Sequence, residues 1–223
     1  MKTKQRINEE LYSKPYLISK SSQERVNHMV KLVGKNKKVL DIGCYDGTIS
    51  KLIKDNGNDV YGVDISEPAV ELARLKGIQA KRADIEEEIP FPNGFFDVIV
   101  MGEVIEHIFD TDNFLKNIRK LLKVNGYVII TTPNLAALGR RILLLFGKNP
   151  LIESSCKEGS HIRYLVKDTI FSLLKSNGFT VDIFTSDVVN FTKSGIFYSA
   201  KLAKLFPTLG RTLIMRAKVE NNC

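Results

Sequence analysis

The sequence predicts an α/β protein built on a doubly wound, mostly parallel sheet of seven strands. Three observations lead to this fold class. Short apolar runs alternate with helical patterns along most of the chain. The run 95–101 is almost continuously apolar, which is typical of a strand buried on both faces of a parallel sheet. Glycine or proline stands at the ends of several segments, where the chain is expected to turn.

The helices are predicted from apolar residues that recur at helical spacing. Val26, Met29 and Val33 share one face of the first helix, which stops at Gly34. Another helix has Pro68 in its first turn, where the missing backbone N–H costs nothing. The predicted helices are 23–33, 47–56, 67–77, 111–122 and 167–176.

The strands are predicted from short apolar runs between those helices. The turn Asn125-Gly126 leads into one strand, which Pro133 stops, and Gly178 separates the last predicted helix from the strand after it. The predicted strands are 38–42, 60–63, 78–83, 95–101, 127–131, 179–184 and 212–217.

A length of 223 residues suits a single domain over residues 1–223. We expect residues 1–22 to form a short N-terminal segment and about 133–166 to form a substrate-lid insertion. Two amphipathic pieces, Leu135–Phe146 and Ile196–Phe206, carry basic residues beside an apolar face. Three interpretations of these pieces stay open: helices packed on their own core, a lid over a hydrophobic substrate, or helices resting on anionic lipid.

Composition and charge indicate in which compartment the protein works and which kinds of partner it could bind. The three cysteines, Cys44, Cys156 and Cys223, are too scattered for a disulfide framework or a zinc motif, which favours a reducing cytoplasm. The basic start has no apolar stretch behind it, so we expect no signal peptide, and no run is long enough to span a bilayer. The net charge of +8 is compatible with an anionic partner or with a scattered lysine surface, and the even spread of lysines favours the second.

The most informative stretch is 39–47, an apolar run that ends in an acidic residue and a glycine turn before a helical pattern. A second run ends at Asp64, about 20 residues on, the position from which a carboxylate holds ribose hydroxyls. A dinucleotide site would need glycine where the chain has Tyr45 and Thr48, which argues against nicotinamide or flavin. The pair indicates an adenosine cofactor, although each aspartate could also cap a helix or turn.

The motif Asp41-x-Gly43-x-x-x-Gly47 resembles the first motif of class I S-adenosylmethionine-dependent methyltransferases, with Tyr45 in place of the usual middle glycine. Further similar segments are 62–64, 96–99, 103–107 and 126–130, and the resemblance covers roughly 25–185. It implies a Rossmann-like fold and S-adenosyl-L-methionine as cofactor. The expected cofactor-binding residues follow the first four strands: Asp41, Gly43, Cys44, Tyr45, Gly47, Asp64, Ile65, Asp84, Ile85, Gly102 and Glu103. Asp64 would hold the ribose, Asp84 the adenine amino group, and the Gly43 loop the methionine end.

The acceptor side is expected at Glu103-Val104-Ile105-Glu106-His107, where residues three and four apart share a face of a helical turn. In one interpretation His107, with Glu106, is catalytic and removes the proton of an acceptor hydroxyl. In the other, a divalent cation orients that hydroxyl. Quinone-pathway O-methyltransferases and the enzymes that methylate the 2′-hydroxyl of small-RNA ends combine such a segment with a later histidine around a metal. That resemblance implies Glu103, Glu106, His107 and His161 as ligands of Mg, Mn, Ca or Zn, whereas metal-free relatives also carry the motif.

These observations predict a cytoplasmic methyltransferase that acts on a hydroxyl of a small-molecule, quinone-like or glycan acceptor, with contact at a membrane surface as an option. The insertion resembles methyltransferases encoded with bacterial glycan-assembly enzymes, which adds a lipid-linked glycan to the acceptor classes. An RNA 2′-O-methyltransferase is the first alternative, but no basic run is interleaved with aromatic residues as stacking on bases would require. A cofactor-binding regulatory module without turnover is the second. The sequence decides neither the acceptor atom nor the oligomeric state.

Overall fold

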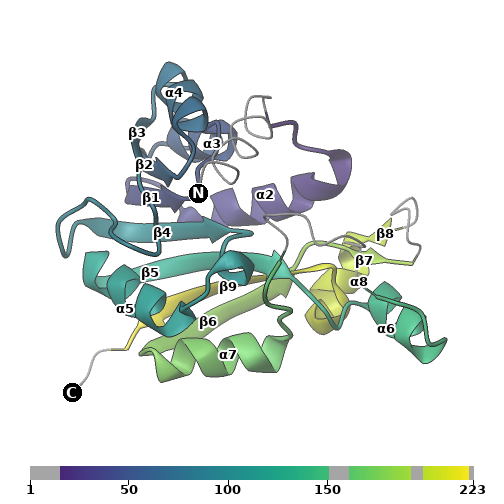
Figure 1. Cartoon of the computed structure of the whole chain (residues 1–223). Coiled ribbons are helices and arrows are strands. Elements are labelled where there is room, and N and C mark those ends of the chain that lie inside the picture. The colour runs from purple at the N-terminus through teal and green to yellow at the C-terminus, as the bar shows by residue number, and fades with distance from the viewer. Residues whose placement is uncertain (1–15, 151–160, 192–197, 221–223) are drawn as a thin grey trace, which may run out of the picture.

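The computed structural model describes residues 16–150, 161–191 and 198–220. The strands of the main sheet are β1 Lys38–Ile42, β2 Asp59–Asp64, β3 Gln79–Arg82, β4 Phe96–Gly102, β5 Leu122–Pro133, β6 Phe179–Ser186 and β9 Thr212–Val219. These seven strands of the described residues lie in the order β3-β2-β1-β4-β5-β9-β6 (Figure 1). The pairs from β3 to β5 are parallel, and β9 runs antiparallel to both β5 and β6. The predicted mostly parallel sheet is confirmed.

Helices cover both faces of this sheet, as the doubly wound prediction requires (Figure 1). The helices are α2 Lys20–Val33, α3 Thr48–Asp55, α4 Glu67–Leu75, α5 Thr111–Leu121 and α7 Lys167–Ser176. Alternate side chains of each strand point to opposite faces. In β1, Leu40 packs into a core with α5 and α7, whereas Val39 packs into a second core with α2, α3 and α4. Both residues are fully buried.

Side-chain caps and glycines fix the ends of several helices. The hydroxyl of Ser19 accepts a hydrogen bond from the backbone N–H of Ser22 at the start of α2, over 3.2 Å. Gly34 ends that helix with a φ of 76°, in the left-handed region that glycine tolerates. Asp110 caps α5 by accepting from the N–H of Asn113 over 3.0 Å. Local sequence signals therefore determine these boundaries, which lie close to the predicted ones.

A smaller group of elements projects from one end of the sheet, at the right of Figure 1. It comprises α6 Leu138–Leu145, β7 Val189–Asn190, β8 Tyr198–Ser199, α8 Ala200–Leu205 and the short 3-10 helix η2 Pro207–Leu209. The helix α6 lies within the predicted insertion 133–166, of which 151–160 fall outside the described residues. None of the residues of α6 is buried. Ile142, Leu144 and Leu145 are exposed, whereas Leu138 and Leu143 are half-buried and the helix contacts β7. The three interpretations of this amphipathic piece therefore stay open.

Other predicted segments fall partly outside the described residues. Of the N-terminal segment 1–22, residues 1–15 are not described, and α2 already begins at Lys20. Of the amphipathic piece Ile196–Phe206, the structure describes residues 198–206, which contain α8. Within the described residues, no helix combines the length and the apolar character needed to cross a membrane.

Candidate active site

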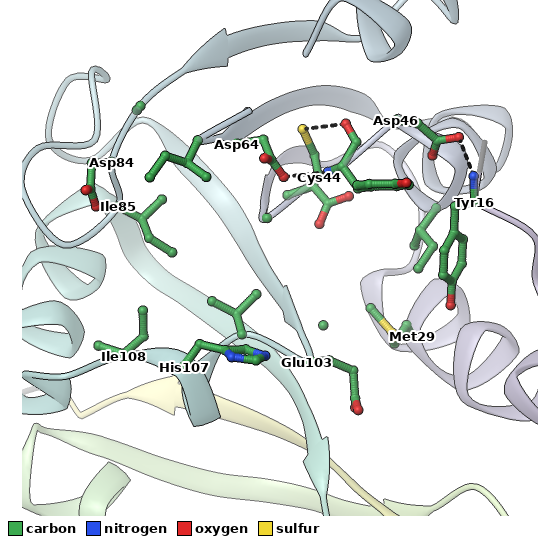
Figure 2. Close-up of a pocket in the computed structure, with 18 of the residues that line it drawn as sticks. Tyr16, Met29, Cys44, Asp46, Asp64, Asp84, Ile85, Glu103, His107 and Ile108 are labelled. Atoms are coloured by element: carbon green, nitrogen blue, oxygen red, sulfur yellow. Dashed lines mark hydrogen bonds between the residues drawn. The ribbon is translucent and has the colours of Figure 1, made fainter. Parts of the chain in front are cut away.

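A pocket of about 630 Å³ opens at the carboxyl ends of β1, β2 and β4, beneath α2. Asp64 and Cys44 lie on one side of it, and His107 and Glu103 lie on the other (Figure 2). This edge of a doubly wound sheet is where such folds bind ligands. The pocket is lined by Tyr16, Arg25, Met29, Asp41, Gly43, Cys44, Tyr45, Asp46, Ile49, Asp64, Ile65, Ala83, Asp84, Ile85, Glu86, Gly102, Glu103, Val104, His107 and Ile108. Ten of the eleven predicted cofactor residues belong to this lining, and Gly47 does not.

The loop after β1 is tied to the end of the next strand. The backbone N–H groups of Gly43 and Cys44 both donate to the carbonyl of Val63, over 2.9 and 3.0 Å. Gly43 and Gly47 have φ values of 69° and 73°, a region that favours glycine. A Cβ on Gly47 would lie 2.9 Å from the Cα of Ala73 in α4. Gly47 therefore shapes the site indirectly, by letting the loop pack against α4.

Asp64 is held rigidly at the end of β2. Its Oδ2 accepts from the backbone N–H of Tyr45 over 2.9 Å, and its Oδ1 accepts from that of Ser66 over 3.0 Å. Burial raises the pKa of this carboxyl, and hydrogen bonds from the backbone of Ser66, Tyr45 and Ile65 oppose the rise. Each carboxylate oxygen has a further lone pair for a ligand hydroxyl. Asp64 therefore combines a fixed orientation with free acceptor capacity at the pocket wall.

The ends of the second and third strands also contribute to the pocket wall. Ile65 follows β2 and is 46% exposed, so a ligand can cover its side chain. Asp84 follows β3, and its Oδ1 accepts from the backbone N–H of Glu86 over 3.0 Å. Ile85, half-buried, lies next to it in the lining. This part of the pocket combines an apolar surface with one carboxylate, an arrangement that suits a flat heterocycle carrying an amino group.

Asp41 lies at the base of the pocket and is only 4% exposed. The hydroxyl of Ser50 donates a hydrogen bond of 2.5 Å to its Oδ2. Burial, together with the nearby charge of Asp64, raises the pKa of Asp41 to about 7 against the opposing effect of that hydrogen bond. Cys44 is also buried, and burial raises the pKa of its thiol so that the thiol stays protonated. The base of the pocket therefore carries less negative charge than its acidic residue and thiol would have in water.

Arg25 in α2 is a pocket residue that sequence reasoning missed. It is 7% exposed, its Nη2 donates to the hydroxyl of Tyr16 over 3.1 Å, and its Nη1 donates to the hydroxyl of Thr131 over 3.3 Å. The same Nη1 lies 4.0 Å from Oε1 of Glu103. No local motif marks Arg25, because only the packing of α2 over the sheet brings it to the pocket. The pocket therefore contains a buried cation, which can pair with an anionic group of a ligand.

Gly102, at the end of β4, allows this close packing of α2. A Cβ at this position would lie 2.9 Å from Cε of Met29 and 3.5 Å from Nη1 of Arg25. Both Met29 and Arg25 line the pocket, so any side chain on Gly102 would push against the wall that α2 provides. Gly102 was predicted as a cofactor-binding residue. The close packing of α2 explains why this position of the pocket has a residue without a side chain.

The segment 103–107 does not form the α-helical turn that the sequence analysis assumed. Glu103 has a φ of 60°, and a short 3-10 helix, η1, spans Ile105–His107. Glu103 consequently points toward Arg25 and accepts a hydrogen bond from the hydroxyl of Thr131 over 3.0 Å. Glu106 is 1% exposed and accepts through Oε2 from the hydroxyl of Thr132 over 3.1 Å. The two carboxylates therefore have different partners on adjacent residues of β5.

Glu106 forms a compact group with His107 and His161. One potential ligand atom from each of the three residues lies within 4.8 Å of the others. The two imidazole rings meet edge to face, with 4.8 Å between their centroids, and Nε2 of His161 lies 3.8 Å from Oε1 of Glu106. Three of the four predicted metal ligands thus come together, and Glu103 is not a member of this group. His107 belongs both to the group and to the pocket lining, so it links the two.

Oε1 of Glu106 is buried and has no hydrogen-bond partner among the described residues. Burial and, after it, the charge of Glu103 raise the pKa of Glu106 to about 8. A buried carboxylate oxygen without a partner is costly unless a proton or a cation compensates it. The group can therefore hold either a shared proton or a metal ion.

The position of His161 is set by main-chain contacts to η1. The backbone N–H groups of Ile162 and Arg163 both donate to the carbonyl of Glu106, each over 3.1 Å. The guanidinium of Arg163 also donates through Nε to the carbonyl of Ile108 over 3.0 Å. These bonds join two segments that are distant in sequence. They explain how a histidine far from the 103–107 segment reaches the pocket edge.

Comparison with known proteins was made by family, by sequence and by structure. The family model described as a methyltransferase domain matches residues 18–182. The mitochondrial ubiquinone biosynthesis O-methyltransferase of Homo sapiens is 29% identical over 155 residues, which cover 65% of this chain and 42% of that protein. The chain therefore spans about two fifths of the length of that relative.

Solved structures share the fold at low sequence identity. A possible histamine N-methyltransferase of Thermotoga maritima has a TM-score of 0.65 and 19% identity, covering 87% of this chain and 88% of its own. The 1,6-didemethyltoxoflavin-N1-methyltransferase of Burkholderia thailandensis, solved with S-adenosylhomocysteine and 1,6-didemethyltoxoflavin bound, has a TM-score of 0.59 and 16% identity, covering 91% of this chain and 79% of its own. At these identities the likeness establishes the fold alone.

Proposed function

The chain belongs to the class I S-adenosylmethionine-dependent methyltransferases, and we propose that it transfers the methyl group of this cofactor to a hydroxyl of a small-molecule, quinone-like or glycan acceptor. The observation that carries the proposal is the pocket at the carboxyl ends of β1, β2, β3 and β4, where predicted cofactor residues from these four strand ends meet. Family membership supports the cofactor, and the group beside His107 supports the acceptor chemistry.

The lining of the pocket offers a candidate partner for each part of S-adenosylmethionine. Asp64, fixed by two backbone hydrogen bonds, would accept the ribose hydroxyls. Asp84 and Ile85 would hold the adenine, one through a carboxylate and the other through apolar contact. The loop at Gly43 would face the methionine end. The guanidinium of Arg25, which already lies 4.0 Å from the carboxylate of Glu103, would pair with the methionine carboxylate as a second group of opposite charge.

Methyl transfer needs alignment of the two reacting centres more than strong acid–base chemistry. The acceptor oxygen attacks the sulfonium methyl carbon, the carbon–sulfur bond breaks, and S-adenosylhomocysteine leaves as a neutral thioether. The hydroxyl proton must leave the acceptor as the new carbon–oxygen bond forms. His107 is the lining residue that we assign to take this proton, with Glu106 as its buried neighbour. Holding the reactants close and in line supplies much of the rate enhancement.

The group Glu106, His107 and His161 also fits a divalent cation. The unpartnered Oε1 of Glu106 is the kind of oxygen that a cation satisfies, and two imidazoles add nitrogen ligands. When bound, the ion would orient the acceptor hydroxyl and lower its pKa. The mixed oxygen and nitrogen set is compatible with Mg, Mn, Ca or Zn. Glu103, which accepts a hydrogen bond from Thr131 and faces Arg25, would lie beside the ion without binding it.

The choice of a hydroxyl acceptor rests on the curated relative, whose name is that of an O-methyltransferase, and on the imidazole–carboxylate group. The two structural neighbours are named as N-methyltransferases, so the fold alone does not select the acceptor atom. An imidazole close to a buried carboxylate suits deprotonation of a phenol or sugar hydroxyl.

The test is transfer of labelled methyl from S-adenosylmethionine to a panel of catechols, hydroxylated quinones, sugar nucleotides, lipid-linked glycans and short RNAs. Formation of S-adenosylhomocysteine with an O-methylated small molecule or glycan supports the proposal. Methylation of a ribose 2′-hydroxyl in RNA, or of an amine alone, would replace the proposed acceptor. Tight cofactor binding with no turnover on any member would instead favour a regulatory module.

A further inference from the structure

The helix α6 carries a group of large apolar side chains that face away from the protein. Ile142, Leu144, Leu145 and Phe146 are 42%, 54%, 80% and 70% exposed. Residues three and four apart share a helix face, so Ile142, Leu145 and Phe146 lie together. Single exposed apolar residues are ordinary on a protein surface, as with Leu75 at the end of α4. Four exposed apolar residues within five consecutive positions at the end of one helix are unusual.

A second exposed apolar pair lies on the neighbouring helix. Leu205 and Phe206, at the end of α8, are 73% and 54% exposed. Both α6 and α8 contact β7, and Figure 1 shows all three in the group of elements that projects from the sheet. We call the side chains of Ile142, Leu144, Leu145, Phe146, Leu205 and Phe206 the projecting apolar surface.

Basic residues accompany this surface, and the sequence stretches that form it contain no acidic residue. Lys148 follows α6, and Lys201 and Lys204 lie on α8 together with Leu205; all three lysines are exposed. The sequence contains no aspartate or glutamate in 132–150 or in 188–219. In the described residues, none of the three lysines forms an ion pair. Within the part of the chain that the structure describes, the lysines beside the projecting apolar surface therefore carry unpaired positive charge.

We propose that the projecting apolar surface docks the protein on an anionic lipid bilayer. Exposed leucine and phenylalanine side chains beside lysines form the pattern of an interfacial helix, in which the apolar face enters the headgroup region and the lysines meet anionic headgroups. A second copy of the chain would bring the same lysines face to face, and like charges oppose such a pairing. Charge complementarity thus selects the lipid surface over self-association.

The proposed docking helix is connected in sequence to the acceptor side of the site. The connection 134–166, which carries α6, also carries His161, and Ile162 beside His161 is 54% exposed. If the proposed function holds, this arrangement favours an acceptor that resides in the membrane, such as a prenylated quinone or a lipid-linked glycan. The docking surface itself does not depend on that function.

Flotation with lipid vesicles tests the docking surface. The full chain is mixed with vesicles of phosphatidylcholine alone or of phosphatidylcholine with phosphatidylglycerol, at physiological ionic strength. The apolar variant is Leu145→Ser with Phe146→Ser, and its control is Leu75→Ser with Val124→Ser, two residues that are 84% and 83% exposed elsewhere. The charge variant is Lys201→Glu with Lys204→Glu, and its control is Lys116→Glu with Lys175→Glu on α5 and α7.

The wild-type chain should float with the anionic vesicles and not with phosphatidylcholine alone. Both surface variants should partition about tenfold more weakly, and both controls should behave as wild type within about twofold. The proposal would be overturned if the wild-type chain did not float, if it bound neutral vesicles equally well, or if the control variants lost as much binding as the surface variants. It would also be overturned if the chain formed dimers that the double variant Leu145→Ser with Phe146→Ser dissociates. Calorimetry with S-adenosylhomocysteine on the same samples separates the two claims, because vesicle binding without cofactor binding contradicts only the proposed function.

Discussion

Oε1 of Glu106 lies 3.8 Å from Nε2 of His161, in a position where that carboxylate oxygen is buried and has no hydrogen-bond partner among the described residues. Burial raises the pKa of Glu106 to about 8, so near neutral pH the group either keeps a proton or needs a positive charge beside it. Each alternative has a separate experimental signature.

If a cation fills this place, removal of metal should abolish turnover. Dialysis against a chelator should lower methyl transfer, and one of Mg, Mn, Ca or Zn should restore it. Glu106→Gln should prevent the restoration, because an amide oxygen is a much weaker ligand for a divalent cation than a carboxylate. The exposed Glu71→Gln in α4 is the control. Undiminished turnover after metal removal would favour the shared proton and His107 as base.

Replacing His107 should separate catalysis from cofactor binding. His107→Ala is expected to lower kcat by roughly a hundredfold or more, because it removes the assigned proton acceptor at the pocket wall. The affinity for S-adenosylhomocysteine should change little, since the cofactor contacts are assigned to the strand ends. His28→Ala in α2 is the matched control, because its ring bonds the carbonyl of Glu24 and does not line the pocket. Unchanged turnover in His107→Ala would remove this residue from catalysis.

Asp64→Ala should abolish most of the cofactor affinity. The loss of two hydrogen bonds to a charged carboxylate, about 1.5–3 kcal/mol each, corresponds to at least about a hundredfold weaker binding. The substitution also leaves the N–H groups of Tyr45 and Ser66 without their acceptor, so thermal unfolding must show that the variant is folded. Asp59→Ala, at the exposed beginning of the same strand, should bind like wild type. Retained affinity in Asp64→Ala would contradict the assignment to ribose.

The pKa of Asp41 predicts a dependence of stability on pH. Burial raises this pKa from 3.8 to about 7, so between those values the folded protein holds a proton that the unfolded chain has released. The contribution of Asp41 to stability therefore falls as the pH rises from about 4 to about 7, by an amount of order 4 kcal/mol. Asp41→Asn keeps the acceptor for Ser50 and removes the titration.

Urea unfolding at the two ends of this pH range measures the effect. The free energy of unfolding of Asp41→Asn, relative to wild type, should be higher at the upper pH than at the lower one. The other buried carboxylates remain in both proteins, so the difference isolates Asp41. An equal change of stability with pH in both proteins would mean that Asp41 does not hold a proton in the folded state.

Much of the fold was predictable because its signals are local. Gly34 ends α2, Asp110 caps α5, and the apolar run at 95–101 becomes the buried strand β4. Strand neighbours are a different matter. A strand at 212–217 was predicted and corresponds to β9, but its antiparallel insertion between β5 and β6 depends on long-range packing that no local pattern encodes.

The candidate site also combines residues that local sequence signals predict with residues that only tertiary packing brings in. Asp64 and Asp84 follow predicted strands, so the topology of a parallel sheet was enough to place them at one pocket. Arg25 was missed because its helix approaches the sheet only in the tertiary structure, where Gly102 leaves room for it. Glu103 was grouped with Glu106 on the assumption of an α-helical turn. Its φ of 60° and the 3-10 geometry that follows send it toward Arg25 instead.

The central claim is that this pocket binds a sulfonium nucleoside, and titration calorimetry of the wild-type chain with S-adenosylhomocysteine tests it most directly. The arrangement of Asp64, Asp84 and Arg25 predicts saturable binding at one site per chain, with no comparable heat from a nicotinamide dinucleotide. A folded sample that gives no binding heat with S-adenosylhomocysteine, or that prefers the dinucleotide, would contradict the account.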